Sequence, residues 1–150
     1  GRLVLADALT YAQKYYKPTC IIDAATLTGA SLMALGQHTS AMMTKDIDLQ
    51  NTLQKLGEQT GDYVWPLPLW DEYKKHLKST RADITNIAAN FQKWGGCIEG
   101  GTFLNHFVEK DTPWAHIDMA PRMESVPGDE LAAGATGEPV SLLTAFVEQF

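Results

Sequence analysis

The amino-acid sequence predicts an α/β domain in which helices flank a mostly parallel central sheet. Three observations support this fold class. Segments with helical periodicity alternate with short apolar segments over residues 1–61, as in sheets covered by helices. Hydrophobic residues make up 45% and charged residues 20% of the chain, which is typical of one globular domain. No internal repeat or break in composition divides the 150 residues.

The first elements follow from apolar spacing and from helix breakers. A helix is expected over residues 1–16, with one apolar face formed by Leu5, Ala8, Leu9, Ala12 and Tyr16. Pro18 ends this helix, and the apolar residues 19–23 predict a strand. A short helix over residues 30–35 is expected to stop at Gly36.

Residues 40–44 predict a second strand, which a third helix follows. Asp46 is placed to cap this helix. Its apolar face holds Leu49, Leu53 and Leu56. The helix is expected to end near Gly57 or Gly61, because glycine commonly terminates helices.

The middle of the chain shows weaker patterns. Two prolines within residues 64–70 favour an extended linker over a central strand. Residues 71–78 predict a short helix and residues 81–96 a loop. A helix is expected over residues 98–108, although the adjacent Gly100 and Gly101 weaken that pattern.

The last third contains one more strand and one more helix. Residues 114–119 alternate like a strand, and residues 120–134 predict a loop. Pro139 is expected in the first turn of the final helix, where proline is favoured. The apolar face of that helix is expected to contain Leu143, Phe146, Val147 and Phe150.

Composition excludes several classes of protein. The formal net charge of −6 argues against a general binder of nucleic acid or of anionic membranes. No apolar run is long enough to span a bilayer, and no signal peptide opens the chain. Cys20 and Cys97 lie far apart, which argues against a disulfide scaffold and fits a cytoplasmic location. The chain opens without Met and within a helical pattern, so we expect it to be part of a longer protein.

Short motifs do not form a complete active site. The four histidines include no HExxH pair, and the glycines form no GxSxG, P-loop or dinucleotide-binding pattern. A thiol enzyme that uses Cys97 and His116 is one alternative, although nothing else in the sequence supports it. Cys97 is otherwise interpreted as a small buried apolar residue.

Two segments are candidate ligand-binding segments because each follows a predicted strand. Residues 26–29 open a helix there, where α/β folds bind ligands, and their N–H groups could meet an anion. The simpler interpretation is a helix cap by Thr26 or Thr28. Residues 118–123 are a second such segment, or else a surface loop. Arg2 stands at a helix start, where the dipole opposes a cation, which predicts an anionic partner unless Arg2 is simply solvated.

Taken together, the segments resemble one family, the leucyl or cytosol aminopeptidases. Residues 1–9 (GRLVLADAL) look like the second half of its Asn-Thr-Asp-Ala-Glu-Gly-Arg signature. Further segments match in family order: residues 23–30 (DAATLTGA), 64–69 (VWPLPL), 78–86 (KSTRADITN), 102–104 (TFL), 114–120 (WAHIDMA) and 134–137 (GATG). The resemblance therefore covers essentially residues 1–150 and implies the C-terminal portion of a zinc-peptidase-like catalytic domain.

The resemblance also implies an activity. Family members release N-terminal amino acids, with a leucine-type preference, by means of two divalent metal ions, zinc or manganese, that activate water. The family's metal ligands would lie upstream of Gly1, so this chain is expected to hold none of them. Peptide substrates, the remainder of the same polypeptide and a homo-hexamer are the partners that the resemblance implies.

Individual residues match the family's functional positions. Arg2 matches the catalytic arginine, which holds a bicarbonate and stabilises the tetrahedral intermediate. Thr26, Leu27 and Gly29 match the segment that lines the substrate site. Ala120 and Met123 match the pocket for the N-terminal side chain.

Two regions depart from the family pattern. Pro121 stands where the family usually has glycine. The stretch of residues 90–101 also departs, and within it residues 99–101 (EGG) replace the family's small, alanine-rich helix start. These departures concern the shape of the pocket.

The alternative from another class is a non-catalytic α/β scaffold or assembly module of the same family. The residues that precede Gly1 would distinguish this scaffold from an active aminopeptidase.

Overall fold

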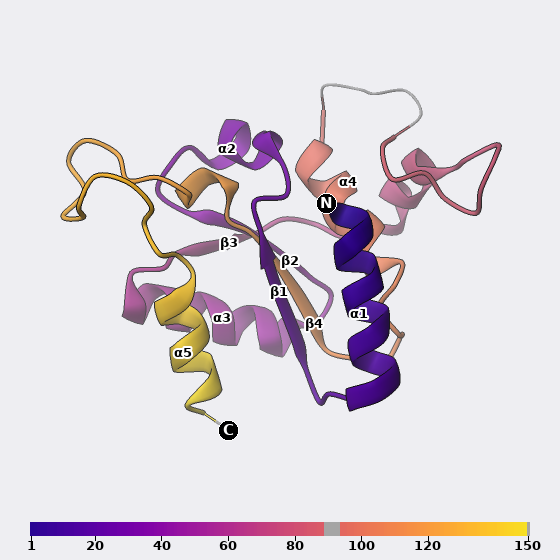
Figure 1. The fold of residues 1–150 in the computed structure, drawn as a ribbon, viewed down its shortest axis with the longest axis horizontal. Helices are drawn as coiled ribbons and strands as arrows, with labels where there is room; N and C mark the ends of the chain where they lie inside the picture. Colours follow the sequence, from indigo (N-terminus) through magenta and orange to yellow (C-terminus); the bar gives the residue numbers. More distant parts are fainter. Residues whose placement is uncertain (89–93, 150) are drawn as a thin grey trace.

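A four-stranded sheet forms the centre of the computed structural model, which describes residues 1–88 and 94–149. Its strands are β1 (Ile21–Ala25), β2 (Ser40–Thr44), β3 (Val64–Pro66) and β4 (Trp114–Asp118). The spatial order is β1-β4-β2-β3 (Figure 1). β1 pairs with β4, and β2 with β3, in parallel, whereas β2 and β4 are antiparallel. The predicted fold class, an α/β domain with a mostly parallel sheet, is confirmed.

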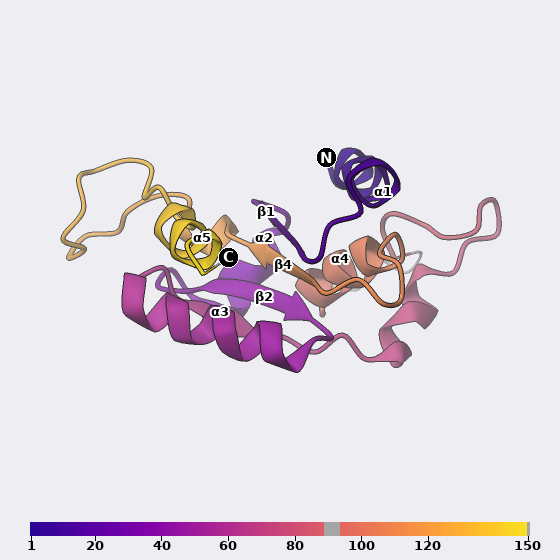
Figure 2. The same ribbon diagram turned by 90° about the horizontal axis from the view of Figure 1, so that it is seen from below.

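Helices cover both faces of this sheet. They are α1 (Arg2–Tyr16), α2 (Gly29–Leu35), α3 (Ile47–Thr60), α4 (Gly96–Asn105) and α5 (Val140–Val147), with 3-10 helices η1 (Asp71–Leu77) and η2 (Ala120–Arg122). α1 and α4 contribute to one core cluster, around Trp114 and Met43. α3 and α5 contribute to the other, around Ile117 and Met42. Figure 2 shows α1 and α3 on opposite sides of the sheet.

The third helix begins and ends as its sequence predicts. The Asp46 side chain accepts hydrogen bonds from the backbone N–H groups of Asp48, at 3.0 Å, and Leu49, at 2.9 Å. Gly61 ends the helix with a φ of 82°, a conformation that favours glycine. Gly57 lies inside the helix instead, where a Cβ atom would come within 2.9 Å of the Asp62 carbonyl oxygen.

The buried face of α1 differs from the expected one. Ala8 and Tyr16 are exposed, whereas the polar Gln13 is buried. The Gln13 amide donates to the Phe107 carbonyl at 2.9 Å and accepts from the Glu109 N–H at 2.7 Å. These bonds satisfy backbone groups in the chain after α4, so burial of Gln13 carries no unpaired polar atom at that contact.

The expected linker over residues 64–70 is wrong for its first part, because Val64–Pro66 forms β3. Within the described sheet β3 pairs with β2 alone, so it is an edge strand. Pro66 lacks an N–H group, which an edge strand tolerates. The Leu67 N–H then donates to the Met42 carbonyl at 2.8 Å and extends the contact.

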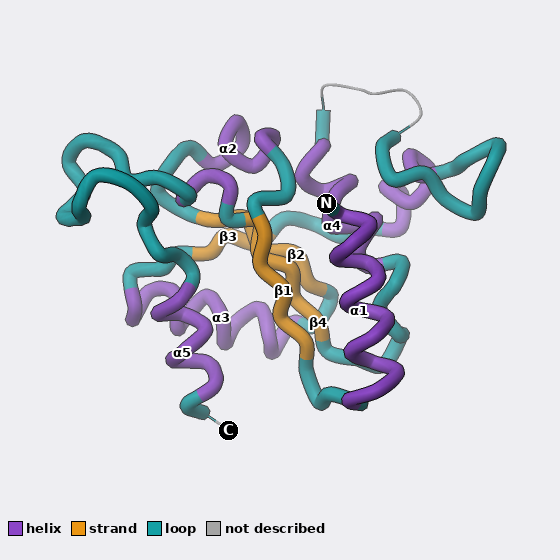
Figure 3. The backbone as a smooth tube through the Cα atoms, viewed as in Figure 1, coloured by secondary structure: helices purple, strands orange, loops and turns teal. Residues whose placement is uncertain are grey.

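Other boundaries shift by a few residues. The strand expected over residues 19–23 is Ile21–Ala25, and α4 covers Gly96–Asn105 rather than residues 98–108. The 71–78 helix is of the 3-10 type, and η2 interrupts the expected 120–134 loop. Pro139 lies just before α5, and Phe150 and part of the predicted 81–96 loop (residues 89–93) lie outside the described residues. Figure 3 shows the long loop that follows η2.

Gly100 and Gly101 do not break α4. A Cβ atom at Gly100 would lie 2.9 Å from Leu27 Cδ2, and one at Gly101 would lie 2.8 Å from Met43 Sδ. The two glycines therefore allow α4 to approach both β2 and the loop after β1. Among the described residues, no helix combines the length and the apolar character needed to cross a membrane.

Candidate functional site

The two segments that follow predicted strands emerge at the same edge of the sheet. β1 and β4 are parallel neighbours, with Ala25 opposite Asp118, so their carboxyl ends lie side by side. The loop after β1 leads into α2, and β4 leads into η2 (Figure 1). α2 also packs against η2. The structure thus brings residues 26–29 and 118–123 together, at the edge where open α/β folds bind ligands.

A buried carboxylate joins these segments. Asp118, the last residue of β4, has no exposed surface. It accepts hydrogen bonds from the Leu27 N–H at 3.0 Å, the Thr28 N–H at 3.1 Å and the Thr28 hydroxyl at 2.7 Å. The Ala120 N–H adds a contact of 3.3 Å. The anion that the N–H groups of this loop meet is therefore the protein's own Asp118.

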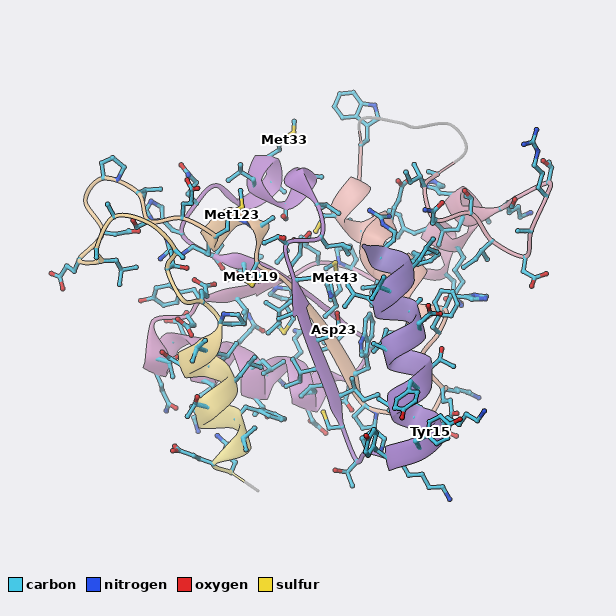
Figure 4. The ribbon with its side chains drawn as sticks, in the orientation of Figure 1. Tyr15, Asp23, Met33, Met43, Met119 and Met123 are labelled. Atoms are coloured by element: carbon cyan, nitrogen blue, oxygen red, sulfur yellow. The ribbon has the colours of Figure 1, made fainter. Side chains whose placement is uncertain are left out.

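The remaining predicted residues of these segments are more open. Thr26 and Gly29 are exposed, and Gly29 is the first residue of α2. Ala120 is 7% exposed and Met123 is 50% exposed. Figure 4 shows Met123 just below α2. An exposed methionine next to a buried alanine offers a flexible apolar contact at this edge.

Arg2 lies at the start of α1, near the same carboxylate. Its Nη1 donates to the Asn86 carbonyl at 2.9 Å. Burial lowers the pKa of the half-buried guanidinium, whereas the negative charges of Asp118 and Glu99 act to raise it. Across residues 1–88 and 94–149 no carboxylate forms an ion pair with Arg2. Much of its donor capacity is therefore available to an anionic ligand.

Glu99, on α4, stands where the family resemblance predicts a small residue. It is 8% exposed, and its Oε1 lies 2.8 Å from Nδ1 of His76. His76 belongs to η1 and its side chain is half exposed. A buried carboxylate needs a partner, and His76 supplies it from outside the helix.

Arg122 anchors the loop that follows η2. Its Nε donates to Glu138 Oε2 at 2.9 Å, and its Nη1 donates to the Gln37 carbonyl at 2.7 Å and to Asp129 Oδ2 at 3.2 Å. Ser40 Oγ donates to the other Glu138 oxygen at 2.5 Å. Burial raises the pKa of the Glu138 carboxyl, and the bonds from Ser40 and Arg122 act in the opposite direction. This network fixes η2, and with it Ala120, next to the start of α5.

The geometry contradicts the alternative of a thiol enzyme. Burial, together with the charge of Asp118, raises the pKa of the Cys97 thiol to about 12, so that thiol is protonated at neutral pH. Cys97 Sγ lies 3.5 Å from Asp118 Oδ2, an acceptor rather than a histidine base. His116 Nδ1 pairs with Asp23 at 2.6 Å, and both cysteines are free.

Within the part of the chain that the structure describes, no three or more His, Cys, Asp and Glu side chains are grouped so that they could hold a metal ion.

The sequence pattern placed residues 118–123 after a strand but assigned no role to Asp118. Its position at the end of an apolar strand is the signal that marks it.

Comparisons with known proteins agree with the geometry. A model of the "Cytosol aminopeptidase family, catalytic domain" matches residues 1–144. A "Probable cytosol aminopeptidase" from Xanthomonas oryzae pv. oryzae is 49% identical over 148 residues, and one from Azoarcus sp. (strain BH72) is 50% identical over 147 residues. Each match covers 98% of this chain but only 28% of the relative. A solved tomato leucine aminopeptidase mutant is 36% identical, with a TM-score of 0.90, over 99% of this chain and 28% of that chain.

Proposed function

Because the chain belongs to the cytosol aminopeptidase family, we propose that it forms the C-terminal portion of an aminopeptidase that releases N-terminal amino acids from peptides, with a leucine-type preference. The observation that carries this proposal is the junction at Asp118. One carboxylate holds together the two segments that the family resemblance assigns to substrate contact, with Arg2 nearby. The chain spans 28% of the length of its relatives, so the activity belongs to a longer polypeptide.

Within that enzyme, residues of this chain would bind and orient the peptide. The exposed edge at Thr26 and Gly29 is open to backbone hydrogen bonds with a peptide, which would fix its orientation. Ala120 and Met123 would contact the N-terminal side chain. Arg2 would hold a bicarbonate or the developing oxyanion, because a planar guanidinium binds such groups with two parallel hydrogen bonds.

The proposed metal ions need ligands from elsewhere in the complete polypeptide. We propose that two divalent ions, zinc or manganese, are bound by residues upstream of Gly1, because the family resemblance places the metal ligands there. The contribution of this chain is then confined to binding and to charge stabilisation by Arg2.

Partners and location complete the proposal. Peptides are the substrates, and the remainder of the same polypeptide and a homo-hexamer are the protein partners. Exposed apolar side chains on α1, at Leu3, Val4 and Tyr11, support a face that further protein covers. We propose a cytoplasmic location, which matches the word cytosol in the names of the relatives and the absence of a paired cysteine.

Hydrolysis of leucine amide tests the proposal. The complete polypeptide, supplied with Zn²⁺ or Mn²⁺, is expected to release leucine, whereas the 150-residue chain alone is expected to bind neither ion tightly and to show no turnover. Calorimetric titration measures the binding. A complete polypeptide without Asp-Ala-Glu before Gly1, and without turnover, would favour the non-catalytic scaffold. Tight stoichiometric binding and turnover by the 150-residue chain would place the metal site within it.

A further inference from the structure

The carboxylate of Asp118 accepts hydrogen bonds from several separate parts of the chain. Its donors come from three separate elements: the loop after β1, η2 and α4. The loop donors, on Leu27 and Thr28, are 91 and 90 residues away in sequence. The Asp118 side chain therefore connects segments of the chain that are far apart in the sequence.

The chemistry of this carboxylate makes its geometry demanding. Asp118 is fully buried and has no ion-pair partner among the residues that the structure describes. A buried charge without a paired cation depends on hydrogen bonds from neutral donors. Both oxygens are used, Oδ1 by the Leu27 N–H and Oδ2 by the Thr28 hydroxyl. A displacement of the loop would weaken both contacts, because hydrogen-bond strength falls steeply with misalignment.

The same carboxylate acts on Arg2 through its charge. Asp118 is the first of the two acids whose negative charge favours the protonated Arg2 guanidinium, although no ion pair links the two side chains. Asp118 is thus connected to each part of the proposed site. It accepts hydrogen bonds from the N–H groups of Leu27 and Ala120, and its negative charge favours the protonated form of Arg2.

We propose that Asp118 is a positioning residue that holds the two substrate-contacting segments in register with each other. This inference rests on the proposed aminopeptidase function. Asp118 touches no substrate in this role. It acts through Leu27 and Thr28 on one side and through Ala120 on the other, and its loss would loosen substrate binding more than it slows the chemical step.

Asp118→Asn tests the proposal with little change in size. The amide presents an N–H₂ group where the carboxylate now presents an acceptor, so one of the loop donors loses its partner. Asp23→Asn is the matched control. Asp23 also lies on a strand of this sheet, and its carboxylate bonds Trp114 Nε1 at 2.7 Å and His116 Nδ1 at 2.6 Å, away from both segments.

Amide hydrogen exchange, measured by mass spectrometry on the complete polypeptide with peptides that cover Leu27 and Thr28, is the first measurement. Asp118→Asn is expected to speed exchange at Leu27 and Thr28 by about tenfold relative to the wild type, the effect of one lost hydrogen bond. Asp23→Asn is expected to leave these two amides unchanged. Equal exchange in wild type and Asp118→Asn, or the same increase in both variants, would overturn the proposal.

Kinetics of the complete enzyme on leucine amide are the second measurement. Asp118→Asn is expected to raise KM by about tenfold and to change kcat less, because the segments bind substrate and transition state alike. A fall in kcat with an unchanged KM would overturn the positioning role. An inactive wild-type enzyme would instead refute the proposed function, and the exchange experiment would still decide the role of Asp118.

A second variant covers the case in which Asp118→Asn does not fold. Thr28→Val removes the hydroxyl that donates to Oδ2 at 2.7 Å but keeps the side-chain shape and the buried carboxylate. It is expected to speed exchange at Leu27 and Thr28 severalfold and to raise KM in the same direction. Unchanged exchange and unchanged KM in Thr28→Val would then count against the proposal.

Discussion

The guanidinium of Arg122 and the carboxylate of Glu138 form a buried ion pair, Nε to Oε2 at 2.9 Å, that ties η2 to the chain entering α5. Arg122 is 8% exposed and Glu138 is 4% exposed. Because both groups are removed from water, neither tolerates the loss of the other. The loop between them, residues 123–137, is therefore anchored at both of its ends.

Breaking this pair is expected to be costly. Glu138→Gln leaves Arg122 buried without its main counter-charge, and it should lower the free energy of unfolding by about 3–5 kcal/mol. Urea denaturation measures the effect. Asp71→Asn is the control, because the exposed ion pair of Asp71 with Lys74 contributes little. A loss as small as that of the control would show that water screens Arg122.

Gly100→Ala is expected to alter the substrate loop more than the stability. The new methyl would lie 2.9 Å from Leu27 Cδ2, the end of a flexible side chain, so Leu27 must shift. The ratio of kcat/KM for leucine and phenylalanine amides should therefore change in the complete enzyme. Gly101→Ala is the matched control, because its methyl presses on Met43 instead. Equal ratios in both variants would contradict a link between Gly100 and the loop.

Cys97 predicts a loss of stability at alkaline pH. The folded thiol has a pKa of about 12, above its ordinary value of 9.0, so the unfolded chain ionises first as the pH rises. The free energy of unfolding therefore includes a contribution from the protonated Cys97 thiol that is fully present below about pH 9. Between about pH 9 and pH 12 the free energy of unfolding falls by about 1.4 kcal/mol per pH unit. Urea denaturation of wild type and Cys97→Ala between pH 7 and pH 10.5 measures it. A difference between the two proteins that stays constant with pH would contradict this prediction.

Much of the fold could be predicted from local sequence, because local contacts decide it. The Asp46 cap and the Gly61 terminus of α3 lie within a few residues of the helix that they delimit. The burial of Gln13 could not be predicted, since its partners Phe107 and Glu109 are 94 and 96 residues away. The candidate site divides in the same way. Residues 26–29 and 118–123 could be predicted, because each segment follows a strand in the sequence. The hydrogen bonds that join these segments at Asp118 could not, because they depend on the pairing of β1 with β4.

Met123 is expected to influence specificity without affecting the fold. It is 50% exposed, so Met123→Ala should leave the unfolding transition unchanged. In the complete enzyme, the preference among leucine, phenylalanine and methionine substrates should shift by about 1–3 kcal/mol, the scale of a methylene or two in an apolar pocket. Met33→Ala, at an 85% exposed position on α2, is the control. Specificity ratios that do not move would place Met123 in a surface loop.

Arg2 is expected to act mainly in the transition state. Arg2→Ala in the complete enzyme should lower kcat and kcat/KM together by about 10²–10³, with KM little changed. Bicarbonate should no longer stimulate this variant. Arg2→Lys should recover part of the rate, because an ammonium keeps the charge without the two parallel donors. Metal content should stay normal in both variants, and a variant with near-wild-type kcat or without its metals would show that Arg2 is structural.

The edge position of β1 has a practical consequence for handling the 150-residue chain. Within the described sheet β1 pairs with β4 alone, and its residues Ile21–Ala25 are half-buried and mostly apolar. The outward-facing side of such a strand is a template for adding another strand. Preparations of the isolated chain should therefore self-associate as concentration rises, and light scattering should detect it.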